Sequence, residues 1–104
     1  MNIIFKDTEL EQLVLYGKSR KYVKYTRDAK FMEKLTSAIN IMRAVKETSM
    51  LANYSFLHYE KLKRVDLSSV RVMNGRIERL IFKEINNGIE IEMLELNNDH
   101  YGKK

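Results

Sequence analysis

Apolar residues recur along this chain with two periods, and each period predicts a different kind of element. The longest helical pattern covers residues 27–46, where apolar positions are separated by four and three. Those positions are Phe31, Leu35, Ala38, Met42 and Val45. We expect this stripe to enter the core of the protein, and a partner helix is the less favoured occupant.

A shorter helix is predicted over residues 9–16, after an apolar run at residues 1–5 that is typical of a strand. Asp7 and Thr8 precede this helix, and Thr8 and Glu11 have the spacing of a capping box. Gly17 follows as a natural C-cap.

The second period is two residues, and it dominates the C-terminal part of the chain. Strands are predicted over residues 68–73, 77–85 and 89–96, with an Asn-Gly pair at each junction. Asn74-Gly75 and Asn87-Gly88 favour type I′ hairpin turns, in which both central residues have positive φ. The chain is therefore expected to be an α+β protein: an N-terminal strand, two helices, and an antiparallel β-meander with the helices packed on one face.

Alternation along the middle strand separates its two faces. Leu80 and Phe82 point to one face, and Arg79, Ile81 and Lys83 point to the other. If the apolar pair packs under the helices, Arg79 and Lys83 stand on the open face of the sheet.

On the last strand the apolar parity changes. Ile89, Ile91 and Met93 share one parity, whereas Leu94 and Leu96 share the other. This switch predicts a β-bulge near Met93 and Leu94.

Composition narrows the class of protein. A chain of 104 residues with 44% hydrophobic and 32% charged residues is expected to form one globular domain, residues 1–104. The absence of cysteine excludes disulfides, thiolate chemistry and Cys-based zinc sites, and two histidines leave few ligands for another metal. No apolar run approaches the roughly 20 residues that cross a bilayer. We expect a cytoplasmic protein that binds no membrane, metal or cofactor.

The net charge of +5 makes an anionic partner plausible, and basic charge is concentrated before the long helix. The segment 18–30 carries Lys18, Arg20, Lys21, Lys24, Arg27 and Lys30 against one acid, Asp28. It is either a solvated face or a docking patch for RNA. We expect its tyrosines, Tyr22 and Tyr25, to be packing residues. The alternative is that they stack on RNA bases.

Ordered motifs over nearly the whole chain resemble the RelE/ParE superfamily of bacterial toxins, and within it the HigB-like branch. The resemblance rests on an ordered set: Phe5-Lys6 with the helix after it, His58-Tyr59-Glu60-Lys61-Leu62-Lys63, Ser69-Val70-Arg71-Val72, Glu78-Arg79-Leu80-Ile81-Phe82-Lys83 and Leu96-Asn97-Asn98-Asp99-His100-Tyr101. No single motif is specific, since the family is highly divergent.

The resemblance implies the toxin of a type II toxin–antitoxin system. Such a toxin enters the ribosomal A site and cuts mRNA there, with the RNA 2′-hydroxyl as nucleophile. Its partner is a cognate antitoxin, usually with a helix-turn-helix DNA-binding domain, through which the complex reaches operator DNA.

The cleavage chemistry needs a proton acceptor, a proton donor and cations beside the phosphate. The resemblance assigns Arg79 to the phosphate, since a guanidinium fork suits phosphate oxygens. It assigns proton transfer to His58, His100 and Tyr101, with Asp99 available to orient a histidine. The family's usual order is Asp-Tyr-His, whereas this chain has Asp99-His100-Tyr101, so it stays open which of His100 and Tyr101 reaches the phosphate. The division of the general acid and base roles between His58 and His100 also stays open.

Further cations are expected to contact RNA or the ribosome. They are Lys18, Arg20, Lys21, Lys24, Arg27, Lys61, Lys63, Arg71 and Lys83. Arg71 and Arg76 could instead be solvated strand and turn charges, which is the favoured interpretation for Arg76.

Two other functions remain open at this point. The same fold also hosts ParE-like inhibitors of DNA gyrase, although His100 and Tyr101 argue against that activity. The basic segment and the altered order at Asp99 leave room for a non-catalytic nucleic-acid-binding or corepressor module.

Overall fold

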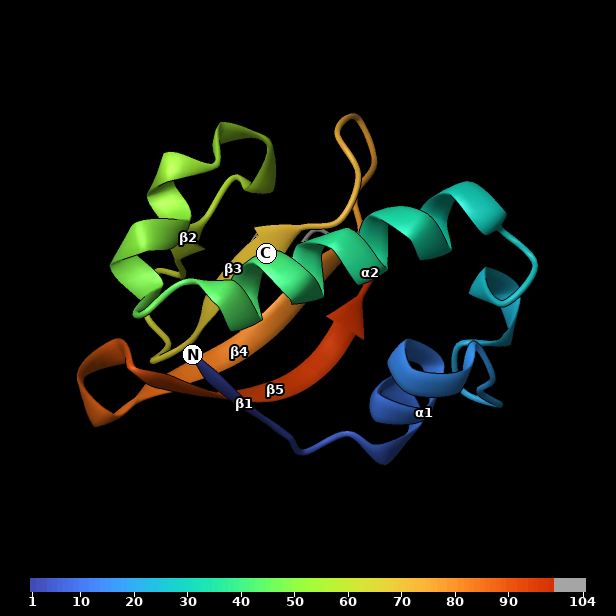
Figure 1. The fold of residues 1–104 in the computed structure, drawn as a ribbon, viewed down its shortest axis with the longest axis horizontal. Coiled ribbons are helices and arrows are strands. Elements are labelled where there is room, and N and C mark those ends of the chain that lie inside the picture. The colour runs from blue at the N-terminus through green and yellow to red at the C-terminus, as the bar shows by residue number, and fades with distance from the viewer. Residues whose placement is uncertain (99–104) are drawn as a thin grey trace.

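The computed structural model describes residues 1–98 (Figure 1). The N-terminal part contains β1 (Asn2–Phe5), α1 (Thr8–Tyr16), the 3-10 turn η1 (Val23–Tyr25) and α2 (Ala29–Ala44). Two 3-10 helices, η2 (Thr48–Asn53) and η3 (Ser55–Leu57), lead into β2 (Glu60–Lys61) and β3 (Ser68–Arg71). β4 (Arg79–Ile85), η4 (Asn86–Gly88) and β5 (Glu90–Asn97) complete the described part. None of its helices is long and apolar enough to cross a membrane.

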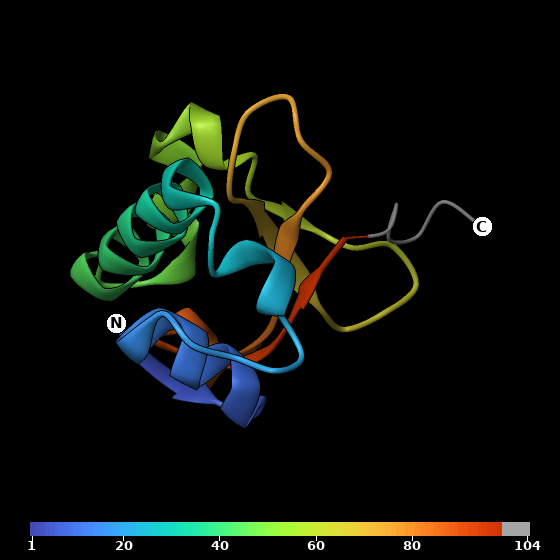
Figure 2. The same ribbon diagram turned by 90° about the vertical axis from the view of Figure 1, so that its right-hand side faces the viewer.

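The strands form one five-stranded sheet in the order β1-β5-β4-β3-β2. β3, β4 and β5 pair antiparallel, so the predicted α+β meander is confirmed. β1 joins the free edge of β5 in parallel, which makes the sheet mixed. Figure 2 shows α2 on one side of the sheet and the loop between β2 and β3 projecting from the other side.

Both helices begin where an aspartate caps them. The Asp28 side chain accepts from the Phe31 amide, and the Asp7 side chain accepts from the amides of Glu9 and Leu10. Since Asp7 takes the N-cap position, the capping box predicted for Thr8 and Glu11 is not formed. Gly17 ends α1 in the left-handed region, at φ 68°.

The apolar stripe of α2 enters the core as predicted. Phe31, Leu35 and Met42 are fully buried and belong to one cluster with Leu80 and Phe82 of β4. Burying side chains of this size contributes about 1.5–3 kcal/mol each. This packing fixes which face of β4 is covered and therefore which face carries Arg79.

The two Asn-Gly pairs behave differently. Asn87 and Gly88 both have positive φ, 59° and 83°, as a type I′ turn requires. Asn74 has no positive φ, and Gly75 alone does, at 84°. The prediction of a type I′ hairpin at Asn74-Gly75 is therefore wrong: a longer loop joins β3 to β4, with the Arg76 amide bonded to the Met73 carbonyl.

The predicted bulge is confirmed. Ile81 pairs with Glu95 and Phe82 pairs with Met93, so Leu94 is the extra residue of β5. Ile81 lies outside the main core cluster and is nevertheless fully buried on the other side of the sheet. The face of β4 that carries Arg79, Ile81 and Lys83 is thus exposed at Lys83 and covered at Ile81.

The basic segment before α2 is a loop that crosses the end of β5. Tyr22 and Tyr25 are buried, which supports their interpretation as packing residues. The Tyr22 hydroxyl donates to Asp7 and accepts from the Leu96 amide, and thereby joins the start of α1 to β5.

The interpretation of Arg76 as a solvated turn charge is wrong. Its guanidinium donates two hydrogen bonds to Glu78, at 3.0 and 2.9 Å, and a third to Asp28 at 2.9 Å. It also lies over the Phe31 ring, 4.9 Å from the centroid. Arg76 therefore joins the loop between β3 and β4 to the start of α2.

Candidate active site

A pocket of about 280 Å³ opens on the side of the sheet that carries Arg79. It is lined by His58, Tyr59, Glu60, Arg71 and Arg79. β4 supplies Arg79, β3 supplies Arg71, and the segment that leaves η3 and enters β2 supplies the other three. Residues up to 21 positions apart in sequence thus line one hollow.

His58 is presented by the backbone between two anchored residues. Leu57 before it is buried, and the Tyr59 hydroxyl after it donates to Glu84. His58 itself is exposed and closes η3 in the left-handed region, at φ 47°. Few residues other than glycine adopt this conformation, and such residues are frequent at functional sites.

The two arginines of the pocket stand opposite each other on neighbouring strands. Arg71 is the register partner of Arg79, and like charges in directly opposed positions destabilise a sheet. Glu60 forms an ion pair with Arg79 Nη1 and relieves part of this repulsion. One carboxylate facing two guanidinium groups leaves the pocket cationic, which suits an anionic ligand.

Two polar atoms on this face lack partners. Within residues 1–98, the Ser69 hydroxyl oxygen and Arg71 Nε are buried and make no hydrogen bond. Unsatisfied buried donors cost about 1–3 kcal/mol each. The two atoms adjoin the cationic pocket, because Arg71 lines it. Ser69 is the register partner of Glu60 and precedes Arg71 by two residues on β3.

The pocket brings a possible phosphate binder together with groups that exchange protons. Arg71 and Arg79 supply forked donors for phosphate oxygens. His58 and Glu60 are the imidazole and the carboxylate that could take a proton from a hydroxyl nucleophile. The arrangement fits transfer chemistry at a phosphodiester.

Glu60 was not among the catalytic candidates from the sequence, although it lies inside the motif that begins at His58. The only usable signal was its place inside that motif, because His58 closes η3 in the left-handed region and strand alternation does not relate the two side chains. The sequence did not reveal its pairing with Arg79, which is 19 positions away.

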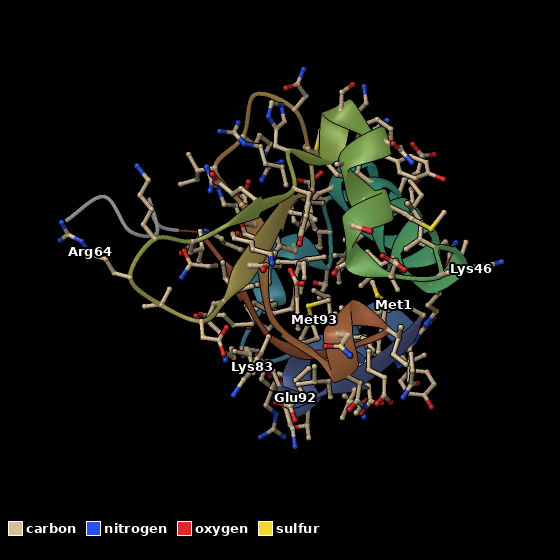
Figure 3. The ribbon with its side chains drawn as sticks, turned by 90° about the vertical axis from the view of Figure 1, so that its left-hand side faces the viewer. Met1, Lys46, Arg64, Lys83, Glu92 and Met93 are labelled. Atoms are coloured by element: carbon tan, nitrogen blue, oxygen red, sulfur yellow. The ribbon has the colours of Figure 1, made fainter. Side chains whose placement is uncertain are left out.

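The other predicted site residues lie elsewhere. Asp99, His100 and Tyr101 fall outside the described residues. Lys61 faces a second, larger pocket, and Lys63 is exposed in the loop between β2 and β3. Lys83 is exposed on β4 as the register partner of Glu92, and Figure 3 shows these two side by side and Arg64 at the tip of the β2–β3 loop.

The basic segment does not line the pocket. Lys18, Arg20, Lys21, Lys24 and Arg27 are exposed between α1 and α2. Lys21 is paired with Asp7 at 2.9 Å. These cations form a separate surface.

The larger pocket has a volume of about 890 Å³ and lies at the edge of the sheet near η2 and the β4–β5 turn. Glu84 lines it and accepts hydrogen bonds from three hydroxyl groups, those of Thr48, Tyr59 and Ser68. Burial raises the pKa of Glu84, but these hydrogen bonds outweigh that effect and hold the pKa below its usual range. Among the described residues, no group of three or more acidic or histidine side chains could hold a metal ion.

Comparison with solved structures gives the fold a context. Over 97% of its length the chain superposes on 98% of a chain in the crystal structure of the heterotetrameric YoeB–YefM toxin–antitoxin complex from Staphylococcus aureus, with a TM-score of 0.51 and 22% sequence identity. The chain has a RelE/YoeB-like fold. No protein family model matches the sequence, and no curated protein is significantly similar to it. The RelE/YoeB-like fold therefore rests on structure, and function must be argued from the pocket.

Proposed function

We propose that this protein is the toxin of a type II toxin–antitoxin module and a ribosome-dependent endoribonuclease that cleaves mRNA in the A site. The observation that carries the proposal is the pocket in which Arg71 and Arg79 face each other beside His58 and Glu60. The RelE/YoeB-like fold supports it, since the structural relative is part of a toxin–antitoxin complex.

In the proposed reaction the RNA 2′-hydroxyl attacks the adjacent phosphorus and the 5′-oxygen of the next nucleotide leaves. Arg79, with Arg71 across the strand pair, binds the nonbridging oxygens and stabilises the charge that develops on them. His58 or Glu60 takes the 2′-hydroxyl proton. His58, His100 or Tyr101 returns a proton to the leaving oxygen, with Asp99 orienting a histidine.

Glu60 has a second role before the substrate arrives. Its carboxylate occupies Arg79 in the free protein, and an incoming phosphate competes for the same guanidinium. Displacement from Arg79 would release Glu60 as a proton acceptor at the moment when the phosphate is bound. The pocket therefore needs no metal ion or organic cofactor for this proposed chemistry.

The proposed partners follow from the same assignment. They are the ribosome with its mRNA, and a cognate antitoxin, with operator DNA reached only through that antitoxin. The exposed cations of residues 18–27, together with Lys61, Lys63 and Lys83, are proposed to contact RNA phosphates, an interaction that weakens steeply with salt. The HigB-like branch and the cytoplasmic location belong to this proposal.

The first test is cleavage by Arg79→Ala, mapped by primer extension of mRNA in a translation reaction with and without ribosomes. We expect the wild-type protein to cut within A-site codons only when ribosomes are present. We expect Arg79→Ala to lose at least about 100-fold in cleavage rate, since it removes a donor to the transition state. Arg43→Ala is the matched control, because it removes an exposed arginine of α2 outside the pocket.

Full cleavage by a folded Arg79→Ala protein would remove Arg79 from the mechanism. Intact mRNA with the wild-type protein would reject the nuclease. DNA-damage signalling on induction would then favour a gyrase inhibitor, and RNA binding without any growth defect would favour a corepressor module.

A further inference from the structure

Glu84 is an unusual residue for its position. Its side chain lies on the same, core-facing side of β4 as those of Leu80 and Phe82. A carboxylate is costly to bury there. Thr48 donates to its Oε1 at 2.8 Å, and Ser68 and Tyr59 both donate to its Oε2, Ser68 at 2.6 Å. Three hydroxyl donors from η2, β3 and the segment before β2 thus meet at one anion.

Tyr59 connects this anion to the candidate active site. Its ring stacks on the fully buried Phe82, with centroids 6.4 Å apart and planes inclined by 14°. Its side chain lines both the larger pocket, with Glu84, and the smaller pocket, with His58 and Glu60. Tyr59 is therefore the wall between the two pockets.

Besides Tyr59, the segment that carries His58 and Glu60 is held by the buried Leu57 before it, by the Glu60–Arg79 ion pair and by β2. β2 contains two residues and pairs with β3 through Glu60–Ser69 and Lys61–Ser68. Both His58 and Glu60 are exposed. A strand this short does not fix the direction of side chains at its start, whereas a stacked ring with a hydrogen-bonded hydroxyl does.

We infer that Glu84, acting through the Tyr59 hydroxyl, is a positioning residue that holds His58 and Glu60 at the distance from Arg79 that proton transfer requires. This inference rests on the proposed function and deepens it. The role needs no contact between the substrate and either Glu84 or the Tyr59 hydroxyl, because that hydroxyl is hydrogen-bonded to Glu84. Their effect is on the orientation of the groups on either side of Tyr59 in the chain.

The decisive variant is Tyr59→Phe, and Ser68→Ala is its matched control. Each removes one hydroxyl donor from Glu84 Oε2 and leaves the carboxylate with two other donors. Only Tyr59→Phe releases the segment between η3 and β2. We expect similar losses of thermal stability, with a fall of about ten-fold or more in cleavage kcat for Tyr59→Phe, since small misplacements of reacting groups are expensive. Ser68→Ala should stay within about two-fold of the wild type.

A second readout does not depend on cleavage. Imidazole ¹H–¹³C signals of His58, assigned with His100→Gln, are expected to shift or split in Tyr59→Phe and to stay unchanged in Ser68→Ala. If Tyr59→Phe does not fold, Glu84→Gln is measured in its place, because it keeps an acceptor oxygen but loses the charge. The same shift in the His58 signals is then expected.

Equal effects of Tyr59→Phe and Ser68→Ala on kcat would overturn the positioning role. Unchanged His58 signals in Tyr59→Phe, or in Glu84→Gln where it is used instead, would overturn it as well. If the wild-type protein cuts no mRNA, the proposed function fails, and the His58 signals alone decide the positioning role.

Discussion

At the scale of single residues, a few charged side chains of this protein are held by specific carboxylate partners rather than by solvent alone. Arg76 is the clearest case, because its hydrogen bonds to carboxylates reach Glu78 on one side and Asp28 at the start of α2 on the other. Glu78 also accepts from the Tyr25 hydroxyl, and its side chain is only 7% exposed. Arg76 therefore neutralises a carboxylate that is nearly buried.

Replacing Arg76 with methionine tests that account. The apolar part of the side chain is kept, and Glu78 loses its cationic partner. Since hydrogen bonds to charged groups contribute about 1.5–3 kcal/mol and Arg76 is partly screened by solvent, we expect a loss of about 2 kcal/mol in the free energy of unfolding. Urea denaturation measures it, with Arg43→Ala as a control that should stay within about 0.5 kcal/mol of the wild type. A loss no larger than that of Arg43→Ala would mean that the pairing of Arg76 with Glu78 and Asp28 contributes nothing to the free energy of unfolding.

At the scale of elements, the turn between β4 and β5 is fitted closely to η2. Gly88 has a φ of 83°, and a Cβ added there would lie 2.5 Å from the Thr48 hydroxyl oxygen. That hydroxyl is also one of the donors to Glu84. The glycine therefore permits both the backbone turn and the approach of η2 to the sheet.

Gly88→Ala and Gly75→Ala separate these two requirements. Both glycines have positive φ, but nothing lies within 4 Å of a Cβ at Gly75. Gly75→Ala should cost about 1–2 kcal/mol from backbone strain alone. Gly88→Ala should cost a further 1–3 kcal/mol, approximately, because Thr48 must move. Urea denaturation measures both losses. Equal shifts of the denaturation midpoint in Gly88→Ala and Gly75→Ala would show that Thr48 and η2 move aside with no loss of stability.

At the scale of the whole molecule, the pKa shifts define a range of pH in which the protein is most stable. Hydrogen bonds and ion pairs outweigh burial and hold the pKa values of Asp7, Glu78 and Glu84 below their usual ranges. Burial, with hydrogen bonds to Asp7, Glu78 and Glu84 respectively, raises the pKa values of Tyr22, Tyr25 and Tyr59 to about 12.

The two sets of shifts predict opposite limbs of a stability profile. A lowered carboxyl pKa contributes stability above the unfolded value, near 4, and this contribution is lost as pH falls through the folded value. A raised tyrosine pKa contributes stability that is lost as pH rises from about 10 towards 12. Thermal melts at constant ionic strength should therefore show a plateau between about pH 5 and pH 9 and a decline on either side.

Tyr22→Phe tests the alkaline limb, since it removes the hydroxyl that joins Asp7 to the Leu96 amide. We expect a smaller loss of stability above pH 10 in this variant than in the wild type. An unchanged alkaline limb would mean that Tyr22 does not titrate with unfolding.

The sequence alone determined the features that depend on neighbours along the chain. The stripe of α2, the C-cap at Gly17, the type I′ dihedral angles at Asn87-Gly88 and the bulge at Leu94 were all predictable, because local periodicity and turn chemistry decide them. It also placed Arg79 on the face of β4 opposite Leu80 and Phe82, and it named His58 as a candidate for chemistry.

Only the tertiary structure decided which of these candidates meet. It brought His58, Arg71 and Arg79 to one pocket, added Glu60, left the cations of residues 18–27 on a separate surface, and turned Arg76 from a turn charge into a partner of Glu78. It also inserted β1 in parallel beside β5. The physical reason is that strand order and side-chain pairing depend on contacts between segments far apart in sequence, whose energies no local pattern encodes.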